Sequence, residues 1–154
     1  MRALACVFLI ACGGGDSEVV GDPLIQTTLT AEFANRPWTP MFGFGRTETT
    51  NMQTRFTLFL GQQKISCADD FDGQPREGNY AAVGIPSAVV GNNTALLMNM
   101  IEVTDGNLTM KLAMGGLQIT AVSATEVSAV FSFDTNDAGM RYAVNGAVTM
   151  LVCP

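Results

Sequence analysis

Apolar and polar residues alternate along much of this chain, which predicts β-strands because successive side chains of a strand point to opposite faces. Residues 54–60, 107–113 and 126–133 each show this period of two. The side chains expected to face the core are Phe56, Leu58 and Leu60 in the first segment, Leu108, Met110 and Leu112 in the second, and Val127, Ala129, Phe131 and Phe133 in the third. In the second segment, Thr109 and Lys111 are expected to face solvent.

Turn residues separate these segments at intervals typical of β-sandwiches and barrels. Asp105-Gly106 predicts a two-residue hairpin turn, since both residue types tolerate positive φ. Further breaks are expected at Gly61, at residues 72–75, 91–93 and 136–139, and at Gly115-Gly116. Together they predict about nine or ten strands in a single antiparallel β-sandwich with Greek-key connections; a small closed β-barrel is the alternative.

Two segments carry less regular patterns. Residues 95–103 are apolar at both parities, which predicts a central strand covered on both faces. Residues 140–153 contain Asn145-Gly146 and form either a short hairpin or one long strand with a glycine bulge. We favour the bulge, because it reverses the parity of the strand and turns Cys153 toward the core.

Length and composition restrict the function. A chain of 154 residues is the size of one domain, and its 47% of apolar residues is enough to build a core. A net charge of -6 argues against nucleic acid as a partner. The chain contains no His, the usual general base, and no G-x-S-x-G pattern, so we expect a protein that is not an enzyme.

The N-terminus has the layout of a signal peptide. Arg2 precedes an apolar run over residues 3–11, which is too short for a transmembrane helix. The sequence Leu9-Ile10-Ala11-Cys12 resembles the lipobox of bacterial lipoproteins, which implies lipidation of Cys12; an ordinary secretory signal or a buried N-terminal strand is the alternative. We therefore expect a signal peptide at 1–11, a lipidated Cys and flexible tether at 12–22 and a β-domain at 23–154.

The lipobox also carries an expectation of localisation. In Gram-negative lipoproteins a residue such as Gly13 after the Cys, rather than Asp, implies sorting to the outer membrane, on its periplasmic or cell-surface face. Loss of Arg2 with the signal would leave seven basic residues against 14 acidic ones, so the lipid alone would hold the protein on the membrane.

Two cysteines remain in the expected domain, Cys67 and Cys153. In an oxidising compartment they predict a structural disulfide. A reactive thiol or a metal site is the alternative, but no His is present to activate a thiol, and two Cys alone do not make a zinc site.

Two other groups of residues are candidate sites. Asp69, Asp70 and Asp72 could hold calcium, although they do not fit the spacing of an EF-hand, and a solvated turn is the simpler interpretation. Trp38, Phe42 and Phe44 would share one strand face and could form an aromatic platform for a ligand. Packing in the core, with Gly43 and Gly45 allowing close approach, is the simpler interpretation here too.

The lipobox, the AEFANRPW segment, the strands GGLQITAV and EVSAVFSF and the closing VNGAVTMLVCP together resemble small lipoproteins of environmental bacteria. The resemblance implies an all-β exported domain and brings no catalytic residues. We expect a lipid-anchored module with a binding or structural role, no cofactor unless calcium binds, and a protein or glycan partner. The alternatives are a carrier of a small apolar ligand and a calcium-dependent or carboxylate-based hydrolase.

Overall fold

The computed structural model describes residues 22–50, 52–67 and 77–154, and these residues form ten strands. The strands are β1 (Gln26–Thr27), β2 (Thr30–Phe33), β3 (Arg36–Trp38), β4 (Phe42–Thr50), β5 (Gln53–Gly61), β6 (Gly78–Ile85), β7 (Gly91–Thr104), β8 (Asn107–Val122), β9 (Glu126–Asp137) and β10 (Met140–Val152). Among the described residues, no helix has the length and apolar character needed to cross a membrane. The predicted all-β fold is confirmed and is consistent with a β-sandwich.

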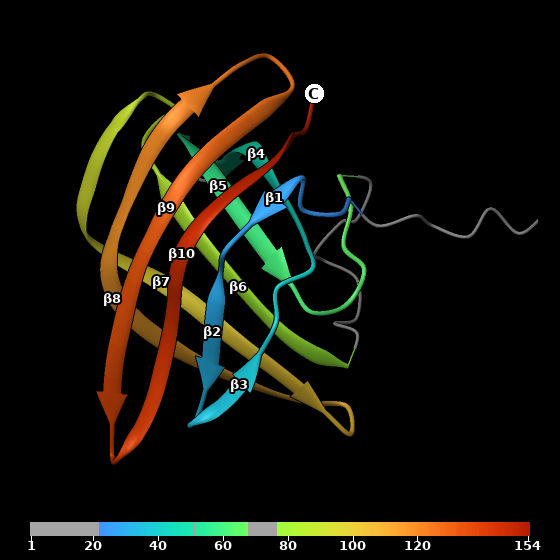
Figure 1. Cartoon of the computed structure of the whole chain (residues 1–154), viewed down its shortest axis with the longest axis vertical. Helices are drawn as coiled ribbons and strands as arrows, with labels where there is room; N and C mark the ends of the chain where they lie inside the picture. The colour runs from blue at the N-terminus through green and yellow to red at the C-terminus, as the bar shows by residue number, and fades with distance from the viewer. Residues whose placement is uncertain (1–21, 51, 68–76) are drawn as a thin grey trace, which may run out of the picture.

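Seven of the strands form a ring (Figure 1). From β4 to β10 each strand pairs antiparallel with the next one in the chain, and β10 closes the ring by pairing parallel with β4. The sheet is therefore mixed, and the run from β4 to β10 is a meander where we expected Greek-key connections. Except for residues 62–77 between β5 and β6, the connections in this run are at most five residues long, and short connections favour pairing between neighbours in the chain.

Two-residue turns with positive φ connect three of the hairpins. Asp105 and Gly106 join β7 to β8 with φ of 51° and 72°, as predicted. Ala34-Asn35 between β2 and β3 and Ala138-Gly139 between β9 and β10 have the same left-handed backbone. Such turns match the twist of paired strands, so each fixes the register of its hairpin. The three hairpin tips lie at one end of the molecule, and the C-terminus lies at the other (Figure 1).

The main core fills the inside of the ring. Its largest fully buried side chains include Leu58, Met98, Met100, Phe131 and Phe133. The inward residues predicted for residues 54–60 and 126–133 are confirmed. On β4 the same face carries Gly43 and Gly45, and a Cβ at Gly45 would collide with the ring of Phe56.

A second apolar cluster, the outer cluster, lies on the opposite face of β4 to β7. It contains Phe44, Phe59, Ile65, Tyr80 and Val103, with Phe42, Cys67, Ala82, Ile101 and Cys153 packed against it. The bulge was predicted in order to turn Cys153 toward the core, but the outer cluster gives Cys153 an apolar environment without a bulge. The prediction of one long strand at residues 140–153 is confirmed, but β10 pairs with β9 without a shift, and Cys153 points into the outer cluster.

The glycine in β10 has another explanation. Gly146 has a φ of +121°, and a Cβ there would lie 2.5 Å from the carbonyl oxygen of Thr28. The close approach of the chain beside β10 therefore requires glycine at this position.

Two further predictions for the central strands are wrong. Gly115-Gly116 does not interrupt β8, because a Cβ at Gly115 would collide with the backbone of β9, which passes close by at Ser132 and Phe133. Residues 95–103 are not covered on both faces, since Leu97 is 54% exposed.

Candidate functional site

The structure does not bring the three candidate aromatic residues onto one face. Trp38 lies on β3 and packs into the main core, whereas Phe42 and Phe44 lie on β4 in the outer cluster. Trp38 is 5% exposed and Phe44 is completely buried. Their role is therefore packing, and no aromatic platform forms from them.

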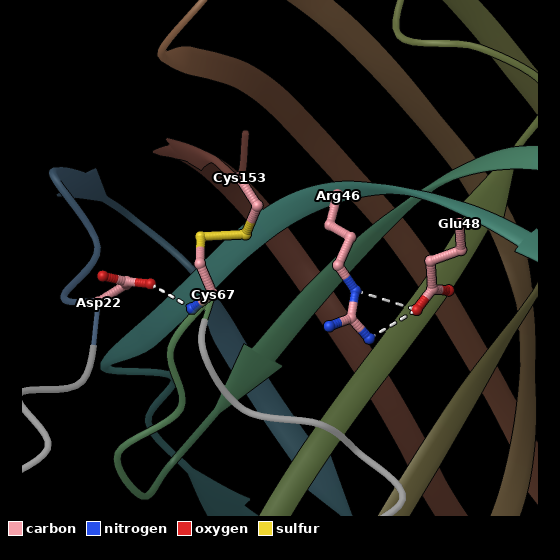
Figure 2. The surroundings of a disulfide bond; sticks show 5 residues. All are labelled: Asp22, Arg46, Glu48, Cys67 and Cys153. Atoms are coloured by element: carbon pink, nitrogen blue, oxygen red, sulfur yellow. Dashed lines mark hydrogen bonds and ion pairs between the residues drawn. A yellow bond between two sulfur atoms is a disulfide. The ribbon is translucent and has the colours of Figure 1, made fainter.

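The predicted disulfide between Cys67 and Cys153 is present, with the two Cα atoms 5.4 Å apart (Figure 2). Asp22 accepts a hydrogen bond from the backbone N–H of Cys67 at 2.6 Å. The N–H of Cys153 donates to the carbonyl of Gly45 at 2.8 Å. The disulfide and these two hydrogen bonds thus join the segment at Asp22, the segment after β5 and the end of β10 to one another and to β4.

Two predicted sites lie outside the described residues. They are the lipidation site Cys12 and the candidate calcium ligands Asp69, Asp70 and Asp72. Within the described residues, no group of three or more Cys, Asp or Glu side chains is placed to hold a metal ion.

A polar groove, which we call the outer groove, runs over the face of β4 to β7 that also carries the outer cluster. It has a volume of about 410 Å³ and is lined by Glu48, Gln53, Arg55, Thr57, Phe59, Ala82, Gly84 and Asn99. Cross-strand pairing places Gly84 opposite Thr57, and Ala82 between Phe59 and Asn99. The groove exists because β6 presents small residues between the longer side chains of its neighbours.

The outer groove continues along the strands. A second hollow of about 470 Å³ shares Gln53, Arg55 and Gly84 with it and reaches Pro86, beyond the end of β6. Both volumes fall within the range of ligand sites. Together the two hollows follow β5 and β6 from Phe59 and Ala82 to Gln53 and Pro86, an arrangement that suits a chain-like ligand.

Polar contacts hold the wall of the groove in place. Arg46 binds Glu48 through two nitrogens, at 2.7 and 3.1 Å (Figure 2). The Arg46 guanidinium also lies over the ring of Phe59, 5.3 Å from its centroid. Arg55 donates to Gln53 at 3.1 Å. The groove therefore presents both hydrogen-bond donors and acceptors on a strand framework.

None of the residues that line the outer groove was predicted from the sequence. The available signal was the occurrence of small residues at alternate positions, Ala82 and Gly84, between the turns predicted at residues 72–75 and 91–93. Such a pattern indicates missing side-chain volume on one face, but only the register shows which long side chains lie on either side of it.

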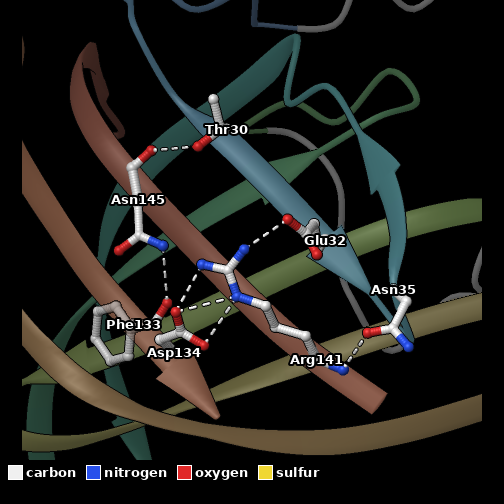
Figure 3. Close-up of polar contacts among 7 residues, drawn as sticks. All are labelled: Thr30, Glu32, Asn35, Phe133, Asp134, Arg141 and Asn145. Atoms are coloured by element: carbon white, nitrogen blue, oxygen red, sulfur yellow. Dashed lines mark hydrogen bonds and ion pairs between the residues drawn. The ribbon is translucent and has the colours of Figure 1, made fainter. Parts of the chain in front are cut away.

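Ion pairs gather at the end of the molecule that carries the hairpin tips. Arg141 on β10 binds Asp134 at 2.6 Å and Glu32 at 2.7 Å (Figure 3). The hydrogen bond from Arg141 lowers the pKa of Asp134 below its usual value. A second pair joins Lys111 to Asp137 at 2.8 Å, and the hydrogen bond that Lys111 donates to Asp137 raises the pKa of Lys111.

These pairs connect strands to one another. Arg141 joins β10 to β2 and β9, and Lys111 joins β8 to the end of β9. Arg36 on β3 binds Glu102 on β7 at 2.7 Å. The cluster therefore links six strands and holds the hairpin ends together.

The outward face of β8 carries a row of apolar side chains, which corrects the prediction for residues 107–113. Leu108, Met110, Leu112 and Met114 are between 50% and 62% exposed. The turn at Asp105-Gly106 pairs the inward Met100 with Lys111 and the inward Met98 with Ala113. The odd-numbered residues of β8 must therefore face inward, and the apolar even-numbered ones face outward.

Comparison of the chain with protein-family models, with curated proteins and with solved structures found no match.

Proposed function

We propose that this chain is a lipid-anchored, exported binding module that holds an elongated polar ligand, a glycan chain, in the outer groove. The outer groove is the observation that carries the proposal. It offers the carboxylate of Glu48, the guanidinium of Arg55 and the amides of Gln53 and Asn99 along one surface. Sugar hydroxyls both donate and accept hydrogen bonds, and this mixture of groups can satisfy both roles.

Binding fits the groove better than hydrolysis does. Glycoside hydrolysis generally uses two carboxyl groups, one on each side of the scissile bond. The residues that line the groove include a single carboxylate, Glu48, and Arg46 already binds it at 2.7 Å.

The groove also fits glycan binding better than it fits the carriage of a small apolar ligand. The inside of the ring is filled by side chains such as Phe131, Phe133 and Met98, which are at most 1% exposed. A carrier of a small apolar ligand needs an enclosed apolar cavity, whereas the outer groove is open and lined mainly by polar side chains.

The proposed anchor is Cys12, and outer-membrane sorting through Gly13 is part of the proposal. Two features support it: the lipobox at residues 9–12 and the disulfide between Cys67 and Cys153. Disulfides of this kind persist in oxidising compartments such as the periplasm. An acyl chain contributes about 0.8 kcal/mol per buried methylene, so two or three chains hold a domain on a membrane durably.

The groove is tested by filling it. A Cβ at Gly84 would lie 3.7 Å from both Arg55 Cδ and Thr57 Oγ1, an ordinary contact, so Gly84→Ala should fold normally and keep most of the space. Gly84→Leu should fill the groove and abolish binding to glycans that the wild-type chain retains on an array of bacterial surface polysaccharides. Equal binding by Gly84→Leu and Gly84→Ala, or no glycan retained by the wild-type chain, would contradict the proposal.

The anchor is tested separately. Cells that express the chain are labelled with radioactive palmitate, and the label is expected on the wild-type protein and absent from Cys12→Ser. The Cys67→Ser/Cys153→Ser double variant should still be labelled, because those cysteines bond to each other. Label that survives Cys12→Ser would exclude the lipobox assignment.

A further inference from the structure

The apolar row on β8 coincides with an open strand edge. Pairing between β8 and β9 begins at Gly115, opposite Phe133, and continues toward the C-terminal end of β8. From Asn107 to Met114, β8 pairs with β7 alone among the strands that the structure describes. This half of β8 therefore has one paired side and one side without a strand.

The backbone groups of the same apolar residues point toward that open side. The N–H of Met114 donates to Thr135 Oγ1 on β9 at 2.8 Å, which fixes its direction. Backbone groups of a strand point the same way at every second residue, so those of Leu108, Met110 and Leu112 also face away from β7. An exposed, flat, apolar edge of this kind is a template for another strand.

Space for a strand exists beside the edge. A hollow of about 660 Å³ lies between Met110 and Leu112 on β8 and Thr135 and Asn136 on β9. Lys111 and Asp137 bind each other at 2.8 Å across it, so the lysine charge on this edge is already neutralised.

The sequence of the edge is symmetric about Met110. An antiparallel pair of two such strands, centred on that residue, places Met110 opposite the second copy's Met110 and Leu108 opposite its Leu112. Thr109 lies opposite Lys111, so the two lysines do not face each other. Each apolar residue thus meets an apolar residue, which an isologous interface requires.

We propose that two copies of this chain pair edge to edge through residues 107–113 of β8, antiparallel and centred on Met110. The symmetric sequence of the edge favours a second copy as the partner, and the outward row has no charged side chain that would repel the same row of that copy. Leu97, which is 54% exposed and pairs with Met114, extends the apolar surface on each copy. This proposal does not depend on the proposed function.

The first test measures mass. The purified full-length chain should appear in native mass spectrometry at twice the monomer mass. Met110→Lys places two lysines face to face at the centre and should give a monomer with an unchanged melting temperature, whereas Met110→Leu should remain a dimer. Val90→Lys is the matched control, because Val90 is 65% exposed and lies outside β8.

The second test fixes the register. Opposite residues of an antiparallel hydrogen-bonded pair have Cα atoms about 5.5 Å apart, within reach of a disulfide. Met110→Cys should therefore form a covalent dimer under mild oxidation, and Met114→Cys, far from its own copy in this register, should not. A monomeric wild-type chain, a dimeric Met110→Lys, or equal cross-linking at 110 and 114 would each overturn the proposal, and recovery only in a complex with another protein would assign the edge to that protein.

Discussion

At the scale of single residues, Gly115 illustrates how close the strands of the ring approach each other. A Cβ on this residue would collide with the carbonyl oxygen of Ser132 and lie 2.6 Å from Phe133 Cα, both of them backbone atoms of β9. We expect Gly115→Ala to reduce the free energy of unfolding by about 1–3 kcal/mol, because backbone cannot move aside as a side chain can. Denaturant unfolding measures the loss.

The control for this substitution is Gly84→Ala. Its new Cβ would lie 3.7 Å from its neighbours, so the expected change is within about 0.5 kcal/mol. If both alanine variants unfold at the same denaturant concentration, the backbone of β9 does not lie as close to Gly115 as described.

Asp134 gives a prediction of pH dependence at the same scale. The hydrogen bond from Arg141 lowers its pKa in the folded protein, so its contribution to stability is present above its usual pKa of about 4 and is lost as the pH falls through the folded value. Asp134→Asn should flatten the fall of melting temperature below pH 4. The effect should be small, since Asp134 and Arg141 are exposed to solvent. An unchanged acid profile would show that the ion pair does not contribute.

At the scale of elements, the turn between β7 and β8 decides which face of β8 is inside. Gly106 has a φ of +72°, and no atom lies within 4 Å of where its Cβ would be. Gly106→Ala should therefore cost about 1–2 kcal/mol, the cost of the left-handed backbone alone. Asp105→Asn is the control, because Asn adopts this backbone as readily as Asp. Thermal unfolding compares the two, and equal melting temperatures would contradict the left-handed turn.

The same strands show how far the sequence predicts the structure. In β5 and β9 the apolar residues occupy one parity, so alternation alone identifies the inward face correctly. In β8 the even-numbered residues are apolar from Leu108 to Met114, but the inward set is odd-numbered and continues through Ala113 and Leu117. Alternation within residues 107–113 therefore predicted the wrong inward face. The inward face is set by the pairing of β8 with β7, which the turn at Asp105-Gly106 fixes.

The disulfide could be predicted from the sequence, whereas the outer groove could not. The number of cysteines and the expectation of an oxidising compartment were enough to predict the bond between Cys67 and Cys153, but not that it would lie outside the ring. The outer groove depends on which residues of β5, β6 and β7 come to lie side by side. Such neighbours are far apart in the chain, so a single sequence contains no direct signal for them.

At the scale of the whole molecule, the ring is closed by seams of unequal length. The seam between β9 and β10 runs without a shift from Met140 to Leu151, whereas the one between β10 and β4 consists of two pairs, Leu151 with Phe44 and Val152 with Gly45. Cys153 follows directly after the short seam and bonds to Cys67. The disulfide therefore adds a covalent link next to the shortest seam of the ring.

Removing this covalent link should destabilise the fold and open that seam first. The bond spans 86 residues, for which chain entropy gives roughly 4–5 kcal/mol, and loss of that amount lowers the melting temperature by about 10–20 °C. In the Cys67→Ser/Cys153→Ser variant, amide hydrogen exchange should accelerate at residues 44–45 and 151–153 while the seam between β9 and β10 stays protected. Uniform acceleration would mean that the ring opens as one unit, and an unchanged melting temperature would mean that the short seam holds without the bond.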